Sequence, residues 1–327
     1  MIIKSNPEFG IELALVIPYA YYLHTQGKLK TVVTSKGMQP FYYFCDDVRE
    51  EFNIRTIDNE AAGLYNIPNP WIHHNALKVF KKDYSLLSKE DQIRANGVLD
   101  YTEWKCPPYS EYYKNNNFNF KKPLVFITNK YNIEHGEEPF GFFGIQCLYD
   151  IFSYLTERGY CVVYKRATNK EGFAIDQNEH NTIISNLRGI QANVEGVGLI
   201  NDHELTKFFD DVYLIDDLIK KDYNKTQLKI MAQAEGFISV CGGNSVLSSC
   251  FGKPVISYVH KGKELRPGYF SDDSYFKQLS NADITPVFDV IASINNINLA
   301  QEYGHTINYT NKNNYKELLE TIKDKFK

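Results

Sequence analysis

The chain has 327 residues, of which 43% are hydrophobic and 23% charged, and its formal net charge is -4. This length is sufficient for two domains, each with its own hydrophobic core. The slightly acidic balance argues against general attraction to nucleic acid, and no apolar run is long enough to span a bilayer. We therefore expect a small molecule or a glycan as the partner.

The cysteines and the first residues indicate the cellular location. The six cysteines show neither a CxxC pair nor metal-ligand spacing, and several lie in apolar runs that are typical of buried, reduced thiols. Residues 1–6 form a strand-like run without the charged start and long apolar core of a secretory signal. We expect a cytoplasmic protein.

The N-terminal part predicts alternating strands and helices. A strand at Ile2–Ser5 is followed by a loop with Gly10, by an apolar helix from about Glu12 to His24 that Gly27 ends, and by a strand at Lys30–Thr34. The order strand, glycine turn, helix, strand indicates an α/β domain with a parallel sheet.

The middle of the chain has a weaker pattern. From Met38 to Lys122 there are many aromatic residues and several prolines, and the polar tract Tyr113–Lys122 is the predicted linker. We place the boundary there, with an N-terminal domain at residues 1–117 and a C-terminal domain at residues 118–327.

The C-terminal part continues in βα steps. The predicted elements are strands at Pro123–Thr128, Tyr160–Lys165 and Val212–Ile215, and helices near Phe143–Arg158, Lys225–Ala234 and Asn313–Lys327. Two Rossmann-like, doubly wound α/β domains that face each other across a cleft are the simplest architecture, with ligands at the carboxyl ends of the strands.

One stretch carries a candidate anion site. The run Phe237–His260 predicts a strand, a glycine turn, a short helix, a second glycine turn and another strand. Gly242 and Gly243 let the backbone approach a ligand, and the N–H groups of the helix that starts near Asn244 and Ser245 would face a phosphate. The alternative is an ordinary βαβ crossover whose glycines only form tight turns.

This glycine turn resembles the donor-binding half of GT-B glycosyltransferases, where such a turn holds the diphosphate of a nucleotide sugar. The first loop is distantly similar to that of fucosyltransferase-like and heptosyltransferase-like GT-B enzymes, with matches at Gly10, Glu12 and Leu13. The first glycine and the asparagine of the fucosyltransferase pattern are missing, so a fucosyl donor is not implied. The resemblance implies that residues 1–117 present the acceptor and residues 118–327 bind the nucleotide sugar.

An inverting transfer needs a base that removes the proton of the acceptor hydroxyl. Glu12 is the first candidate, although a carboxylate in a first helical turn also stabilises the helix dipole without catalysis. Glu134 and His135 follow the strand at Pro123–Thr128 and are further candidates.

Polar residues after the predicted strands complete the candidate donor site. Lys130, Lys165 and Arg166 would stabilise the charge of the leaving diphosphate, as such side chains do in inverting GT-B enzymes. The other candidates are Asn129 and Tyr131 for sugar hydroxyls, Tyr223 and Gln227 for the nucleobase, and Glu264 for ribose or sugar hydroxyls. Each of these residues also fits a solvated turn, a helix start or the surface.

No metal or other cofactor is expected. Among the paired aspartates, only Asp216-Asp217 follows a predicted strand, and a helix cap or solvated turn explains this pair better than a metal site. His73-His74 lacks a third ligand at helical spacing, which argues against zinc.

These features predict a glycosyltransferase that moves a hexosyl or deoxyhexosyl group from a nucleotide-diphosphate sugar to a glycan hydroxyl, with inversion and without a metal. Two alternatives stay open. A GT-B-shaped nucleotide-sugar epimerase would need no acceptor, and a non-catalytic protein could keep only carbohydrate or nucleotide binding.

Overall fold

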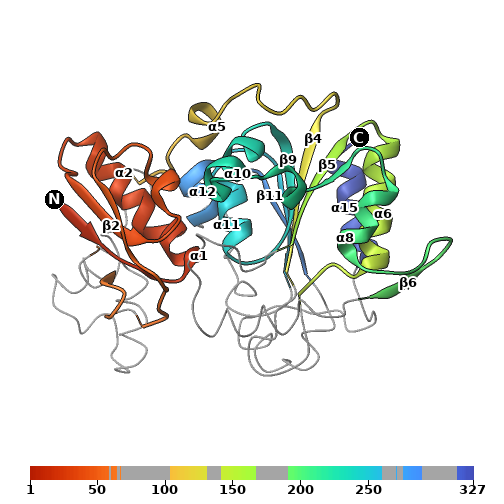
Figure 1. The fold of residues 1–327 in the computed structure, drawn as a ribbon, viewed down its shortest axis with the longest axis horizontal. Coiled ribbons are helices and arrows are strands. Elements are labelled where there is room, and N and C mark those ends of the chain that lie inside the picture. The colour runs from red at the N-terminus through yellow and green to blue at the C-terminus, as the bar shows by residue number, and fades with distance from the viewer. Residues whose placement is uncertain are drawn as a thin grey trace. The chain divides into compact units, whose positions relative to one another are not determined.

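Two units of the chain each contain a parallel sheet. The computed structural model describes residues 1–58, 60–64, 67, 104–130, 141–166, 191–259, 270, 275–288 and 315–327 (Figure 1). Unit 1 consists of Met1–Pro107 and Gly172–Gln177, and unit 2 of Pro108–Glu171 and Asn178–Lys327. No helix in the described part of the chain is long and apolar enough to cross a membrane.

Unit 1 contains a three-stranded parallel sheet. Its strands are β1 (Ile2–Lys4), β2 (Thr31–Ser35) and β3 (Val48–Phe52), in that order. Three helical segments connect β1 to β2, namely α1 (Phe9–Ile11), the π-helix η1 (Glu12–Val16) and α2 (Ile17–Thr25), and the 3-10 helix η2 (Gln39–Tyr42) precedes β3. The predicted order of strand, helix and parallel strand is confirmed.

The ends of this helical run follow from local sequence. Gly27 has a φ of 64°, and the N–H of Lys28 bonds to the carbonyl of Leu23, which satisfies a carbonyl at the helix end. The run begins at Phe9, so Gly10 lies inside α1 and not in a turn before it. The expected helix start at Glu12 is therefore three residues too late, because Glu8 already takes the extended N-cap conformation, with φ of -48° and ψ of 144°.

Unit 2 is built on a six-stranded parallel sheet with the order β11-β10-β9-β4-β5-β8. The strands are β4 (Leu124–Asn129), β5 (Cys161–Arg166), β8 (Val212–Leu214), β9 (Ala234–Val240), β10 (Val255–Val259) and β11 (Ile284–Phe288). Every residue of β4 and β10 is buried, which explains why these strands are mostly apolar in the sequence.

Helices cover both faces of this sheet, as Figure 1 shows for α10 and α11 on one side and α6 and α15 on the other. The helices are α5 (Tyr109–Tyr112), α6 (Ile145–Glu157), α8 (Asp202–Leu205), η5 (Thr206–Phe208), α9 (Ile215–Leu218), α10 (Tyr223–Met231), α11 (Gly243–Ser249), α12 (Tyr275–Ser280) and α15 (Tyr315–Lys325). A hairpin of β6 (Ala192–Val194) and β7 (Gly198–Ile200) precedes α8. The doubly wound α/β class predicted for this part is confirmed.

The strand order creates a topological switch point in unit 2. From β4 the chain moves outward to β5 and β8, whereas from β9 it moves outward in the opposite direction to β10 and β11. The central strands β4 and β9 are hydrogen-bonded neighbours. In sheets of this kind the ligand crevice lies at the carboxyl ends of the two strands where the order reverses.

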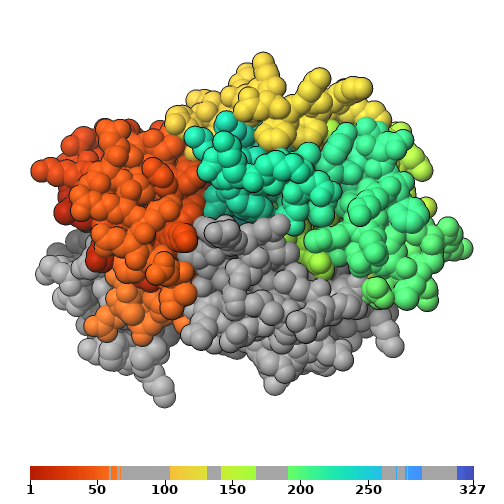
Figure 2. Space-filling model, viewed as in Figure 1, coloured from red at the N-terminus to blue at the C-terminus, as the bar shows by residue number. Residues whose placement is uncertain are grey.

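The segment before β4 packs on unit 2. Asn115 donates a hydrogen bond of 2.9 Å to the carbonyl of Lys229 in α10 and accepts one of 3.2 Å from Gln233. Ser110 donates a bond of 2.7 Å to the carbonyl of Phe251. Figure 2 shows the segment in yellow against the green and teal atoms of unit 2. The tract Tyr113–Lys122, expected as a linker, therefore belongs to the body of this unit, and the division between the units follows Pro107.

Gly236 in β9 packs against the ring of Phe326 near the C-terminus, and this contact yields a stability prediction. A Cβ at this position would lie 2.7 Å from the ring of Phe326 and 3.3 Å from the carbonyl oxygen of Pro254. We expect Gly236→Ala to lower the free energy of unfolding by about 1–3 kcal/mol, because the ring must shift in a packed core. Urea unfolding measures the effect. The loss should be smaller in a Phe326→Leu background, and equal losses in both backgrounds would contradict the clash.

Candidate functional site

Lys130 lies against a glycine turn at the switch point. It directly follows β4, while Cys241 and Gly242 directly follow β9. A Cβ built on Gly242 would lie 3.3 Å from Nζ of Lys130, and Gly242 has a φ of 137°. Glycine is needed here both for the backbone conformation and for the space that the ammonium group occupies.

A second lysine reaches the same turn from β5. Nζ of Lys165 donates a hydrogen bond of 3.0 Å to Oδ1 of Asn244 in the first turn of α11 and lies 5.9 Å from the ring centroid of Tyr223. The side chain is buried, at 5% exposure. An ammonium group has three donors, and among the described residues no carboxylate lies within ion-pair distance of this one.

Burial sets the protonation of Lys165. Desolvation lowers the pKa of its ammonium group to about 8, and the charge of Asp216 in α9 partly offsets this by raising it. The same desolvation raises the pKa of the Tyr223 hydroxyl, again with a contribution from Asp216. An anion bound beside Lys165 would stabilise the protonated form.

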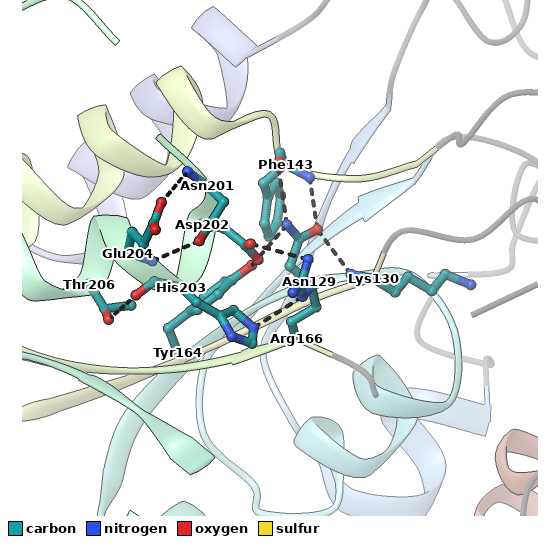
Figure 3. Close-up of polar contacts among 10 residues, drawn as sticks. All are labelled: Asn129, Lys130, Phe143, Tyr164, Arg166, Asn201, Asp202, His203, Glu204 and Thr206. Carbon is teal, nitrogen blue, oxygen red and sulfur yellow. Dashed lines mark hydrogen bonds and ion pairs between the residues drawn. The ribbon is translucent and has the colours of Figure 1, made fainter. Parts of the chain in front are cut away.

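Arg166 forms an ion pair and a hydrogen bond with other side chains of unit 2. One guanidinium nitrogen lies 3.2 Å from Oδ1 of Asp202, and its Nε donates a bond of 3.1 Å to Nε2 of His203. The hydroxyl of Tyr164 donates to the other oxygen of Asp202 at 2.6 Å. Figure 3 shows these residues as one cluster, from which the side chain of Lys130 points away.

Asn129 was expected to orient sugar hydroxyls, but the protein itself uses all of its hydrogen-bonding capacity. Its amide bonds to the backbone of Lys130 and Phe143 and to the hydroxyl of Tyr164, and the side chain is fully buried. In this arrangement no donor or acceptor is left for a ligand.

The candidate base Glu12 lies in a closed polar cluster of unit 1. Its Oε1 accepts hydrogen bonds from Thr34 at 2.5 Å and Tyr42 at 2.8 Å, and its Oε2 forms an ion pair with Arg55. The side chains of Glu12 and Arg55 are 0% and 1% exposed. Burial and the neighbouring carboxylate raise the pKa of Tyr42. These contacts hold the π-helix η1 to β2.

The remaining donor candidates in the described part lie on α10 and α11. Tyr223 begins α10, with Asp222 at its N-cap. Gln227 lies one turn further, is buried at 1% exposure, and its Oε1 has no hydrogen-bond partner among the described residues. Gly243 begins α11, where Ser245 is fully buried with its hydroxyl 3.0 Å from that of Ser257.

Several predicted site residues cannot be placed. Tyr131, Glu134, His135 and Glu264 lie outside the described residues, as does the pair His73-His74, and their roles stay predictions. Asp216 and Asp217 lie in the first turn of α9. Within the described ranges, no group of three or more His, Cys, Asp or Glu side chains is arranged to hold a metal ion.

Comparison with solved structures identifies the fold. The chain aligns with E. coli ADP-heptose LPS heptosyltransferase II at a TM-score of 0.50 and 8% identity, over 99% of this chain and 98% of the other. The fold is that of the GT-B glycosyltransferases. A family 9 glycosyl transferase from Veillonella parvula aligns at a TM-score of 0.48 and 8% identity, over 99% of this chain and 96% of the other. E. coli heptosyltransferase WaaC with ADP aligns at a TM-score of 0.48 and 10% identity, over 92% of this chain and 98% of the other. No family model matches the sequence, and a search of curated proteins finds no match.

Sequence reasoning missed the partners that hold the charged groups. Arg55, Asp202 and His203 were not singled out, since each pairs with a residue distant in the chain. A local signal existed only for the turn that carries Asp202, where Asn201 and Glu204 form a capping box.

The Glu12–Arg55 pair yields a stability prediction. Arg55→Met would leave the buried carboxylate of Glu12 without its ion pair, and we expect a loss of about 3–5 kcal/mol in unfolding free energy. Adding Glu12→Gln removes the unpaired charge and keeps an acceptor for Tyr42, so the double variant should recover much of the loss. Denaturant unfolding of both variants tests this, and a loss below about 1 kcal/mol for Arg55→Met would contradict it.

Lys165 yields a pH prediction. Because its pKa is lowered to about 8 from 10.5, the unfolded chain binds more protons than the folded chain between these values, and the lysine's contribution to stability rises with pH across this window. Below pH 8 the buried charge is destabilising, so Lys165→Met should be more stable than wild type by about 1–3 kcal/mol at neutral pH, with the difference shrinking toward pH 10.5. Thermal unfolding from pH 7 to 10 measures this. The exposed Lys225→Met should show no such trend, and a constant difference for Lys165→Met would refute it.

Proposed function

We propose that the chain is a glycosyltransferase whose second unit binds a nucleotide-diphosphate sugar at the glycine turn of residues 242–244. The observation that carries the proposal is the convergence of Lys130 and Lys165 on this turn, at the switch point of a parallel sheet. A diphosphate would fit this site, because two cations lie at a backbone turn that carries no side chain at Gly242. One solved structure that shares the fold is named for ADP-heptose, which supports a nucleotide sugar as the donor.

The two lysines would supply the electrostatic part of the mechanism. As the glycosidic bond breaks, negative charge develops on the leaving diphosphate, and preorganised donors at that position lower the barrier. Lys165 is buried with one hydrogen bond to Asn244, so an anionic oxygen can occupy its remaining donors. We propose that these cations act in place of a metal ion, and that the transfer inverts the anomeric centre.

The acceptor would be a glycan hydroxyl bound by the N-terminal part, and the sugar a hexose or deoxyhexose. Glu12, Glu134 and His135 remain the proposed bases. Glu12 accepts hydrogen bonds from Thr34 and Tyr42. It can take a proton from an acceptor only if that acceptor replaces one of these bonds. We propose that the reaction takes place in the cytoplasm.

The test is binding of nucleoside diphosphates and nucleotide sugars, each with and without Mg²⁺, measured as a shift in the thermal unfolding temperature. We expect stabilisation of the wild type without Mg²⁺. Gly242→Val should abolish it, because a side chain there would occupy the space beside Nζ of Lys130. Lys130→Met or Lys165→Met should weaken binding at least about tenfold through loss of a charge-assisted bond. Affinity should fall above pH 8 as Lys165 loses its proton.

Lys225→Met is the matched control. It removes the same charge from the exposed side of α10 and should leave affinity nearly unchanged. No response of the wild type to any nucleotide would refute the donor site. A new glycosidic product that forms only when a hydroxyl acceptor is present would identify a transferase, whereas an epimerase changes the donor without an acceptor.

A further inference from the structure

The side chain of Asn129 forms hydrogen bonds that connect two backbone segments at the carboxyl end of β4. Its Oδ1 accepts hydrogen bonds from the backbone N–H groups of Lys130, at 3.0 Å, and Phe143, at 2.9 Å. Its Nδ2 donates to the carbonyl oxygen of Phe143, at 3.0 Å, and to the hydroxyl of Tyr164, at 3.2 Å. One fully buried amide thus joins the chain that leaves β4 to the chain that enters α6.

The hydroxyl of Tyr164 determines which way this amide faces. Tyr164 donates its proton to Oδ2 of Asp202 at 2.6 Å, a charge-assisted hydrogen bond. Its oxygen is then left to accept, so it contacts the NH₂ side of Asn129. The oxygen side of the amide consequently faces the N–H groups of Lys130 and Phe143 (Figure 3).

Asp202 is itself held in one orientation. It is fully buried, and its second oxygen lies 3.2 Å from the guanidinium group of Arg166. The helical turn that carries it is fixed by the capping box of Asn201 and Glu204. A buried carboxylate with fixed partners gives the Tyr164 hydroxyl a single favourable direction.

We propose that Asn129, oriented by Tyr164 and Asp202, is the positioning residue for Lys130 at the glycine turn, an inference that rests on the proposed function. The side chain of Lys130 extends to Gly242 from the Cα next to this held backbone N–H. None of the three residues needs to touch the ligand. They act by fixing the backbone from which the flexible lysine side chain extends, so that less backbone freedom is lost on binding.

The decisive variant is Tyr164→Phe, which removes the orienting hydroxyl and keeps the ring. With inorganic pyrophosphate as the probe and calorimetry on the full chain, we expect its dissociation constant to rise about tenfold relative to wild type. In a Lys130→Met background the same change should have little effect, because the hydroxyl acts through Lys130. Backbone amide exchange of ligand-free Tyr164→Phe should show faster exchange at Lys130 and Phe143.

Tyr154→Phe is the matched control, since its hydroxyl donates to the carbonyl of Phe326 at 2.9 Å and has no bond to this network. It should change neither pyrophosphate affinity nor exchange at Lys130. Equal losses for Tyr164→Phe in both backgrounds, or unchanged affinity and exchange, would overturn the inference and leave the proposed function standing. Absence of pyrophosphate and nucleotide binding by the wild type would instead overturn both.

Discussion

The pairing of β4 with β9 is the contact on which the candidate site depends. Thr128 lies opposite Ser239 in this register, and their hydroxyls are 2.5 Å apart in the buried centre of the sheet. The register brings the carboxyl ends of the two strands to the same level, so that the residue after β4, Lys130, meets the turn after β9 at Gly242. A slip of this pairing would separate the lysine from the turn and turn buried side chains to the other face.

Two buried charged side chains, Glu12 in unit 1 and Lys165 in unit 2, are held in different ways. In unit 1, Glu12 and Arg55 neutralise one another, and Thr34, Tyr42 and the carbonyl of Pro7 take up further hydrogen bonds. In unit 2, Lys165 is buried with a neutral amide as its hydrogen-bond partner. A closed ion pair stabilises a fold in one arrangement, whereas a buried cation without a paired anion is retained at a cost in stability. Such a cost is typical of a binding site, where the ligand supplies the missing charge.

Arg166 differs from Lys165 although the two are neighbours in β5. Successive side chains of a strand point to opposite faces, and the sheet therefore sends Lys165 toward α11 and Arg166 toward α8. The guanidinium group pairs with Asp202 and His203 and belongs to the network behind Asn129. Two adjacent cations that look equivalent in the sequence thus take different roles, one at the proposed ligand site and one in the support of Lys130.

Much of the fold could be predicted because the inner strands of unit 2 are apolar over most of their length. The strands at residues 124–129, 161–166 and 255–259 and the helices near residues 145–157 and 315–325 were identified within a few residues, since burial on both faces leaves a local signature. Polar residues carry no comparable signature. Asn129 was expected to contact a ligand and instead bonds to the backbone of Lys130 and Phe143. The contact with Phe143 could not be predicted from local sequence, because the two residues are fourteen positions apart.

The sequence by itself determined the α/β class, the glycine turn at 242–243 and the presence of lysines near the carboxyl ends of two strands, since periodicity and glycine act over a few neighbouring residues. Only the tertiary structure decided that Lys130 and Lys165 meet at one turn, that Glu12 is paired with Arg55, and that Asp202 stands behind Asn129. These contacts join segments far apart in the chain, and they depend on strand order and register, which local sequence does not specify.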